Sequence, residues 1–269
     1  MANNLLQGKI GVISGALDDQ SIAWKIAERA VEEGATILLT NAPVAFRFGK
    51  IQKLAEKLGA EAIPADATSE EDWQNLFEQA QDKLGGKLDF VLHSIGMSLN
   101  VRKKREYTNL KYDWMQKTFD ISAISFHKMM QTLYRMDAMK DYGSILGLTY
   151  IAAQRTFPDY SEMAESKALL ESFARSFGYH FAMKNNVRVN TVSQSPTMTT
   201  AGQGVKGFQE FFDYADKMSP LGNASADACA DFCLTLFSDY TRSITMQNLY
   251  HDGGFSSMGM SPALIDLEE

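Results

Sequence analysis

The 269-residue sequence alternates short, apolar, β-branched runs with longer amphipathic stretches, and this alternation restricts the possible folds more than any other feature. The strand-like runs are 10–14, 36–40, 61–64, 90–93, 144–150, 187–192 and 247–251. The helical patterns between them are 21–33, 49–58, a stretch from 69, 112–140, 161–183 and 226–238. Repeated βα units bury a parallel sheet between two helical layers. The sequence therefore predicts an α/β fold of Rossmann type, with a doubly wound parallel sheet of about seven strands and helices on both faces.

Composition excludes several other classes of protein. No Pro/Ser-rich linker, repeat or low-complexity tract divides the chain, so we expect a single domain over residues 1–269. The formal net charge of −7 argues against a nucleic-acid partner. No secretory signal and no apolar run of about 18 residues is evident, so we expect a cytoplasmic protein without a membrane partner. Cys229 and Cys233, four residues apart, are expected to be a buried pair on one helix, and the four scattered histidines predict no metal site.

In sheets of this kind, ligands bind beyond the carboxyl ends of the strands, so the segments after each strand are the candidate site. The first strand is followed by Gly15, and Ser21 and Ile22 open a helix whose free N–H groups suit a pyrophosphate. The alternative is a plain strand–helix turn in which Ser21 is only the N-cap. This turn lacks the other glycines of the G-x-G-x-x-G pattern, so it does not decide between the two.

The next two strand ends carry weaker indications of a dinucleotide. After the second strand, Asn41 and Ala42 stand where an NAD-binding protein often has an acid for the adenosine ribose. Arg47 and Lys50 lie downstream and either bind the 2′-phosphate of NADPH or are solvated charges. The sequence therefore does not decide whether the cofactor is NADH or NADPH. Asp66, after the third strand, is suited either to an adenine amino group or to capping the following helix.

The segment from Tyr150 to Lys167 is the most specific part of the sequence. Tyr150 ends the fifth strand, and Tyr160 and Lys167 are seven residues apart. On one helix, that spacing places both side chains on the same face, roughly 10 Å apart along the axis. Pro158 predicts the start of that helix. The alternative is that Tyr160 packs in the core and Lys167 points to water.

Taken together, these segments resemble the short-chain dehydrogenase/reductase superfamily and, more closely, its bacterial NADH-dependent enoyl-acyl-carrier-protein reductases. Ordinary members of the superfamily carry Y-x3-K, whereas this chain has Met163 at that tyrosine position and a Y-x6-K pattern with a second tyrosine ten residues upstream. The resemblance spans almost the whole chain. Its segments are Gly15 with 21–23, Asp66, 93–96, Tyr150, Tyr160, Lys167, 187–190, 196–199 and 251–255.

The resemblance implies hydride transfer from NADH, or alternatively NADPH, to the β-carbon of an enoyl thioester in type II fatty acid synthesis. Tyr160 would donate to the enolate oxygen, Lys167 would hold the nicotinamide ribose, and Tyr150 would position the substrate. The residues expected to contact the cofactor are Gly15, Ser21, Ile22, Ala42, Asp66, Ala67, Ser94, Ile95, Gly96, Lys167, Pro196, Thr197, Met198, Thr199 and Thr200. Those expected to contact the substrate are Met97, Ser98, Tyr150, Tyr160, Met163, Val205 and Phe208.

Residues 197–217, with Gly202, Gly204 and Gly207 among phenylalanines, predict a hinged substrate flap; the alternative is a short helix pair with its own small core. The resemblance also implies an acyl carrier protein as partner and a homotetramer. Because the carrier proteins are acidic, docking would need local basic residues. The candidates are Lys206 and the run 102–105. The alternative for the run 102–105 is a solvated loop. Two other functions stay open: a carbonyl reductase or alcohol dehydrogenase, and a non-catalytic dinucleotide-binding regulator.

Overall fold

A computed structural model describes residues 3–200, 202–204 and 207–264 of the chain, built around one sheet of seven parallel strands. The spatial order is β3-β2-β1-β4-β5-β6-β7. The strands are β1 (Ile10–Ser14), β2 (Thr36–Asn41), β3 (Glu61–Pro64), β4 (Leu88–His93), β5 (Met139–Thr149), β6 (Arg188–Gln194) and β7 (Asn248–His251). The predicted doubly wound parallel sheet is confirmed.

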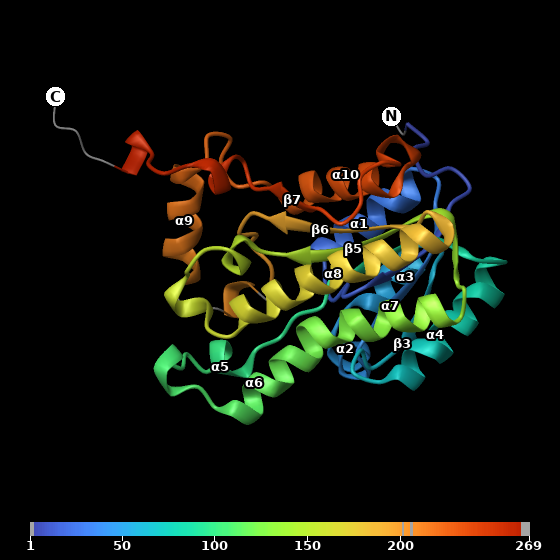
Figure 1. Cartoon of the computed structure of the whole chain (residues 1–269), viewed down its shortest axis with the longest axis horizontal. Coiled ribbons are helices and arrows are strands. Elements are labelled where there is room, and N and C mark those ends of the chain that lie inside the picture. The colour runs from blue at the N-terminus through green and yellow to red at the C-terminus, as the bar shows by residue number, and fades with distance from the viewer. Residues whose placement is uncertain (1–2, 201, 205–206, 265–269) are drawn as a thin grey trace.

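Helices cover both faces of the sheet (Figure 1). One face packs against α1 (Ile22–Glu32), α3 (Ile51–Leu58) and α10 (Ala226–Phe237). The other face packs against α4 (Glu70–Leu84), α7 (Ser125–Arg135) and α8 (Met163–Asn185). Strand residues alternate between the two layers, as Val12 and Ile13 do, because successive side chains of a strand point to opposite faces. Cys229 and Cys233 are free and buried in α10, which confirms the predicted buried pair.

Shorter elements gather at one end of the sheet. They are α5 (Leu99–Arg102), α6 (Tyr112–Phe119), α9 (Phe208–Met218) and two 3₁₀ turns, Ile151–Ala153 and Pro158–Tyr160. Figure 1 shows α5, α6 and α9 beyond the same end of the strands, with α9 apart from the two helical layers. The helix α2 (Pro43–Phe48) follows β2. The loops that leave the carboxyl ends of β1, β4, β5 and β6 converge at the end of the sheet where α5, α6 and α9 lie.

Two predicted helix boundaries are wrong. The helix expected over 112–140 is divided into α6, a π-helical stretch Asp120–Ile124 and α7, and β5 already begins at Met139. The helix expected to carry both Tyr160 and Lys167 begins only at Met163, since Ser161 has φ 47° and ψ −145°, which no helix tolerates. Tyr160 lies in the preceding 3₁₀ turn, so the shared helix face and the axial spacing predicted for these two residues are incorrect.

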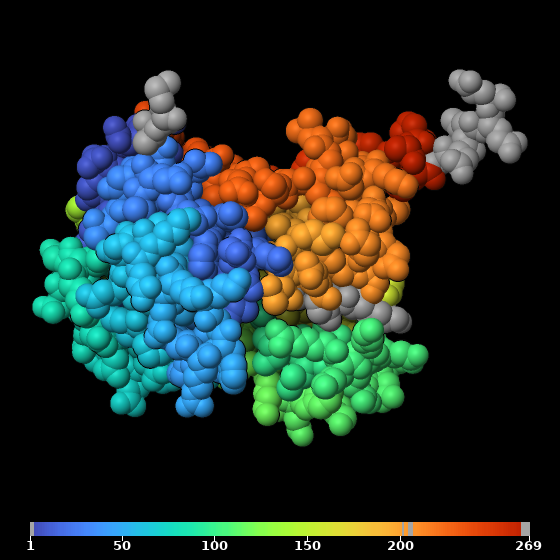
Figure 2. Space-filling view, turned by 180° about the vertical axis from the view of Figure 1, so that it is seen from behind, coloured from blue at the N-terminus to red at the C-terminus, as the bar shows by residue number. Residues whose placement is uncertain are grey.

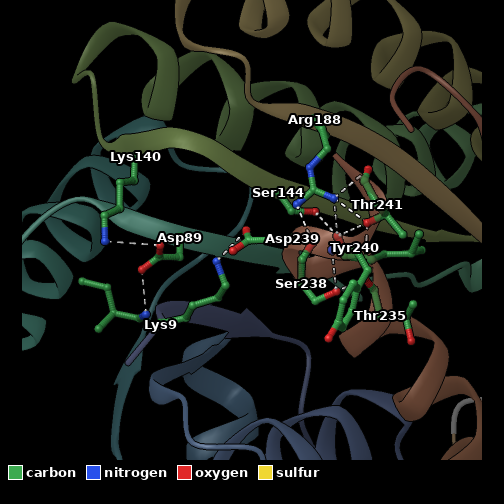
Figure 3. Close-up of polar contacts among 12 residues, drawn as sticks. Lys9, Asp89, Lys140, Ser144, Arg188, Thr235, Ser238, Asp239, Tyr240 and Thr241 are labelled. Carbon is green, nitrogen blue, oxygen red and sulfur yellow. Dashed lines mark hydrogen bonds and ion pairs between the residues drawn. The ribbon is translucent and has the colours of Figure 1, made fainter. Parts of the chain in front are cut away.

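The opposite end of the sheet is a polar anchor region (Figure 3). Arg188, at the start of β6, donates to the carbonyl oxygens of Leu236 at 2.9 Å and Ser238 at 3.1 Å. Asp89 accepts from the Ile10 N–H at 3.0 Å, and its other oxygen lies 3.4 Å from Lys140 Nζ. These polar groups bind one another, which leaves the carboxyl end as the candidate functional end.

None of the helices in the described part of the chain has the length and apolar character needed to cross a membrane. Within the same ranges, no three His, Cys, Asp or Glu side chains come together in a way that would hold a metal ion.

Candidate active site

The exits of β1 and β4 touch at Gly15. This residue has φ 95°, and a Cβ atom there would lie 2.0 Å from the carbonyl oxygen of Ser94. A side chain at position 15 is therefore excluded by both backbone conformation and space. The contact brings the predicted cofactor residues Gly15 and Ser94 together at the carboxyl end of the two central strands.

The N-terminus of α1 follows this turn. Ser21 occupies the N-cap position, but its hydroxyl makes no capping hydrogen bond to the helix. Instead, Ser21 Oγ donates to the Asp18 carbonyl at 2.6 Å and accepts from the Leu17 N–H at 3.2 Å. The first-turn N–H groups of α1 are thus not capped by Ser21, and such groups suit a phosphate. Ser21 is thus the N-cap residue that the alternative expected, but its side chain does not cap the helix.

The segment after β6 reaches across to the same turn. Thr200 Oγ1 donates to Asp18 Oδ2 at 2.6 Å, which ties the start of the predicted flap to the loop after β1. Thr197 Oγ1 donates to the Ser195 carbonyl at 2.9 Å, and Pro196 is buried. The predicted residues Met198 and Thr199 lie between these anchors. The exits of β1, β4 and β6 are therefore joined into one site.

The outer strands contribute ordered loops. Asn41 Nδ2 donates to the Ala16 carbonyl at 2.9 Å, and Asn41 Oδ1 accepts from the Ala42 N–H at 2.8 Å. Lys50 Nζ lies 3.7 Å from Asp19 Oδ1. Asp66 Oδ1 accepts from the N–H and hydroxyl of Thr68, at 2.9 and 2.8 Å, so it caps the turn that precedes α4. Contact of Asp66 and Ala67 with an adenine remains a prediction.

Lys167 is a buried cation on α8, with 9% of its surface exposed. Its Nζ donates to the Leu148 carbonyl of β5 at 2.9 Å. Burial lowers its pKa to about 8, while the charge of Glu171 opposes the shift. The expectation that Lys167 points to water is incorrect.

Gly96, in the loop after β4, faces this lysine. A Cβ atom at Gly96 would lie 3.7 Å from Lys167 Nζ and 4.0 Å from Met163 Cε. The structure thus brings together predicted residues from two segments: Gly96 from the loop after β4, and Met163 and Lys167 from α8. Because Gly96 has no side chain, it leaves space beside the ammonium of Lys167, which a bound ribose would require.

Glu171 lies one turn after Lys167 and is a residue that sequence reasoning missed. Its Oε1 accepts from Thr149 Oγ1 at 2.8 Å, and Gln154 Nε2 donates to its Oε2. Burial raises its pKa, and Thr149 partly offsets that effect. The i, i+4 spacing from Lys167 is the sequence pattern that would have identified it.

Tyr150 and Tyr160 are close neighbours although they lie in different elements. Their ring centroids are 5.2 Å apart, and the Tyr150 ring also lies 5.4 Å from Phe157 and 6.1 Å from Phe211 of α9. Burial raises the pKa of both phenols above the ordinary value. Both hydroxyls therefore stay protonated near neutral pH and act as hydrogen-bond donors. Sequence reasoning missed Phe157 as part of this aromatic cluster.

A buried carboxylate follows the Tyr160 turn. Glu162 has no exposed surface, and its Oε1 accepts from Ser98 Oγ at 2.7 Å, Thr118 Oγ1 at 2.8 Å and Asn100 Nδ2 at 3.1 Å. The hydroxyl of Ser98, a predicted substrate residue, therefore bonds to Glu162, and contact of Ser98 with a substrate remains a prediction. Nothing in the sequence pattern distinguishes Glu162 from a solvated glutamate at the start of a helix.

The remaining substrate predictions differ in outcome. Met97 is held by its N–H, which donates to Ser122 Oγ at 2.9 Å. Phe208 stacks near Phe212, with ring centroids 6.1 Å apart, whereas Phe211 is the α9 residue that reaches Tyr150. Val205 and Lys206 lie outside the described residues. Substrate contact by Met97 and Phe208 remains a prediction.

The sequence and the structure are both similar to known reductases. Residues 15–256 match the family described as Enoyl-(Acyl carrier protein) reductase. A structure described as a FabI–NADH complex from Alistipes finegoldii is 62% identical, with a TM-score of 0.97, and the match covers 99% of this chain and 94% of that one. Enoyl-[acyl-carrier-protein] reductase [NADH] 1 of Rhizobium meliloti is 33% identical over 96% of this chain and 94% of its own.

A third relative supports the same assignment. The enoyl-[acyl-carrier-protein] reductase [NADH] of Rickettsia typhi is 30% identical over 98% of this chain and its own full length. The matches span the βα units and all the strand exits described above. The chain therefore belongs to the enoyl-(acyl carrier protein) reductase family.

Proposed function

We propose that this protein reduces the carbon–carbon double bond of an enoyl thioester carried on an acyl carrier protein, with NADH as the reductant. The observation that carries the proposal is the pair of half-buried phenols of Tyr150 and Tyr160, 5.2 Å apart between ring centroids beyond the exit of β5. The names of the relatives support the reaction and the cofactor.

The residues at the strand exits fit a dinucleotide. The uncapped N-terminus of α1 is suited to the pyrophosphate, and Gly15 lets that turn approach the loop after β4. Gly96 and the ammonium of Lys167 are suited to the nicotinamide ribose, whose hydroxyls would accept from Nζ. The bound cofactor supplies a hydride to the β-carbon of the substrate.

Tyr160 is proposed as the hydrogen-bond donor to the thioester oxygen. Addition of hydride to the β-carbon leaves negative charge on that oxygen as an enolate, and a donor aimed there lowers the barrier. The raised pKa of the Tyr160 phenol keeps its proton in place until charge develops. We assign Tyr150 to positioning the substrate, because its ring packs against Tyr160 and Phe157.

Lys167 adds a positive charge close to the reacting groups. In a buried site this charge favours a developing anion more than it would in water. Its hydrogen bond to the Leu148 carbonyl fixes the ammonium, and Glu171 offsets part of the cost of burying it. Phe211 of α9 closes the aromatic cluster, which helps to exclude water from the enolate.

We propose NADH as the preferred cofactor on two observations besides the names of the relatives. The Asn41 side chain is occupied by backbone groups of positions 16 and 42, so β2 ends in neutral groups. Lys50, one of the two cations that could bind a 2′-phosphate, lies 3.7 Å from Asp19. Neither feature favours the extra phosphate of NADPH.

The acyl carrier protein, a homotetrameric assembly and a cytoplasmic location are parts of the same proposal. The first is supported by the printed names of the family and its relatives. The other two rest on the family resemblance alone.

The proposal is tested by Tyr160→Phe, which removes one hydroxyl and keeps the ring. With a crotonoyl thioester we expect kcat to fall roughly 100-fold or more, since the enolate loses its donor, while NADH binding measured by fluorescence is unchanged. The matched control is Tyr179→Phe on the exposed part of α8, which should behave as wild type. A kcat for Tyr160→Phe within twofold of wild type would remove Tyr160 from the mechanism.

A further inference from the structure

Residues 99–117, which we call the basic lobe, hold a local surplus of positive charge in an acidic protein. This stretch contains six basic residues, at 102, 103, 104, 105, 111 and 117, and only two acids, Glu106 and Asp113. Arg102, Lys103 and Lys104 are exposed. Among the described residues, no ion pair involves any of the six, whereas lysines such as Lys57 and Lys83 pair with glutamates.

The basic lobe has a fixed conformation. Ser98 Oγ caps α5 by accepting from the Val101 N–H at 3.0 Å, and the Arg105 N–H donates to the Asn100 carbonyl at 3.0 Å. Arg105 Nε donates to the Asn109 carbonyl at 2.8 Å. The buried Asn100 side chain bonds both the N–H and the carbonyl of Lys111.

The lobe is attached directly to the candidate active site. Tyr107 Oη donates to Glu165 Oε1 at 2.6 Å, and Ser161 Oγ donates to the Arg105 carbonyl at 3.4 Å. Asn100 of the lobe, with Ser98 and Thr118 that flank the lobe, bonds to Glu162, two residues after Tyr160. Figure 2 shows this green lobe facing the orange region that contains α9, and we call the boundary between the two the seam.

The helix across that seam carries the opposite charge. Within α9, Glu210, Asp213 and Asp216 outnumber the single basic residue, Lys217. An acidic partner would be repelled from α9 and attracted to the basic lobe, which carries unpaired cations. Charge complementarity therefore selects one side of the entrance.

We infer that the basic lobe is the docking surface for the acidic carrier protein, with Arg102 and Lys103 as its principal contacts. The inference rests on the proposed function and specifies where the partner binds. Docking there places the carrier next to the Tyr160 turn, so that its thioester-linked chain enters the seam between the lobe and α9. It also explains why the cations of this lobe have no acidic partners within the described residues.

The test compares one acyl group on two carriers. We expect Arg102→Gln/Lys103→Gln to raise KM for crotonoyl-acyl carrier protein about tenfold at low salt, because two attractive charges are lost. Its kcat, and its KM for crotonoyl-coenzyme A, should match wild type. The control Lys53→Gln/Arg242→Gln removes the same charge from exposed positions on other elements and should change neither KM.

Two results would overturn the docking surface. One is an unchanged KM for the carrier substrate in the Arg102→Gln/Lys103→Gln variant. The other is an equal increase with coenzyme A, which would mean that the cations bind a phosphate and not the protein. Failure of the wild-type enzyme to reduce either thioester would instead refute the proposed function, and the docking surface with it.

Discussion

At the residue scale, Lys167 connects burial to chemistry. Its ammonium lies between the Leu148 carbonyl and the space left by Gly96, and burial lowers its pKa to about 8. The group is therefore charged below about pH 8 and becomes neutral above it. A neutral amine keeps a hydrogen bond to a ribose but loses the charge that attracts a dinucleotide anion.

This shift predicts that NADH affinity falls as the pH rises through about 8. Fluorescence titration between pH 6.5 and 9.5 measures the dissociation constant directly, without turnover. Lys167→Met should bind NADH more weakly at every pH and without this dependence. A wild-type affinity that stays constant across that range would show that the lysine charge makes no contribution to binding.

At the scale of elements, the carboxyl ends of the strands form the candidate site, whereas the amino ends carry structural anchors. Arg188 begins β6, and its guanidinium, 2% exposed, binds carbonyls of Leu236 and Ser238 at the C-terminus of α10 (Figure 3). These carbonyls have no partner within the helix, and they carry the negative end of its dipole. The buried cation thus joins the helix α10 to the sheet at the end opposite the candidate site.

Replacing this anchor should destabilise the fold and leave the chemistry intact. Arg188→Met is expected to lower the free energy of unfolding by about 2–4 kcal/mol, because the carbonyls of Ser238 and Thr241 lose their donor and that of Leu236 loses one of its donors. Urea denaturation measures the loss. Exposed Arg242→Met is the matched control and should stay within about 0.5 kcal/mol of wild type. A loss for Arg188→Met no larger than that of the control would contradict the anchoring role.

The elements also show how far sequence reasoning extends. Alternation of strand and helix patterns is a local property repeated seven times, so the sheet and its two layers were predictable. The onset of α8 was not, because Pro158 is compatible with either a 3₁₀ turn or an α-helix. Ser161 has a positive φ, and Glu162 beside it makes tertiary contacts with Ser98 and Asn100 that the local sequence does not reveal. Tyr160 consequently meets Tyr150 through a turn, whereas a shared helix with Lys167 was expected.

At the scale of the whole molecule, the sheet converts distant segments into one site. Gly15 follows β1, Gly96 follows β4, and Tyr160 and Lys167 follow β5, yet all lie beyond the carboxyl ends, because every strand is parallel. In a parallel sheet the carboxyl ends of all the strands lie at the same end of the sheet, which is why ligands bind there. The basic lobe and α9 stand on either side of this end and form its rim (Figure 2). At the opposite end of the strands, Arg188 and Asp89 link neighbouring elements through hydrogen bonds.

The central claim is that the site at the carboxyl ends of the strands reduces the double bond of enoyl thioesters and not carbonyl groups. A carbonyl reductase of the superfamily needs a tyrosine where this chain has Met163, which is buried beside Gly96. The most direct test is NADH consumption by the purified wild-type protein, followed at 340 nm with a crotonoyl thioester and separately with simple ketones. The account predicts turnover with the thioester and none with the ketones. Turnover of ketones alone, or NADH binding without turnover of any substrate, would contradict it.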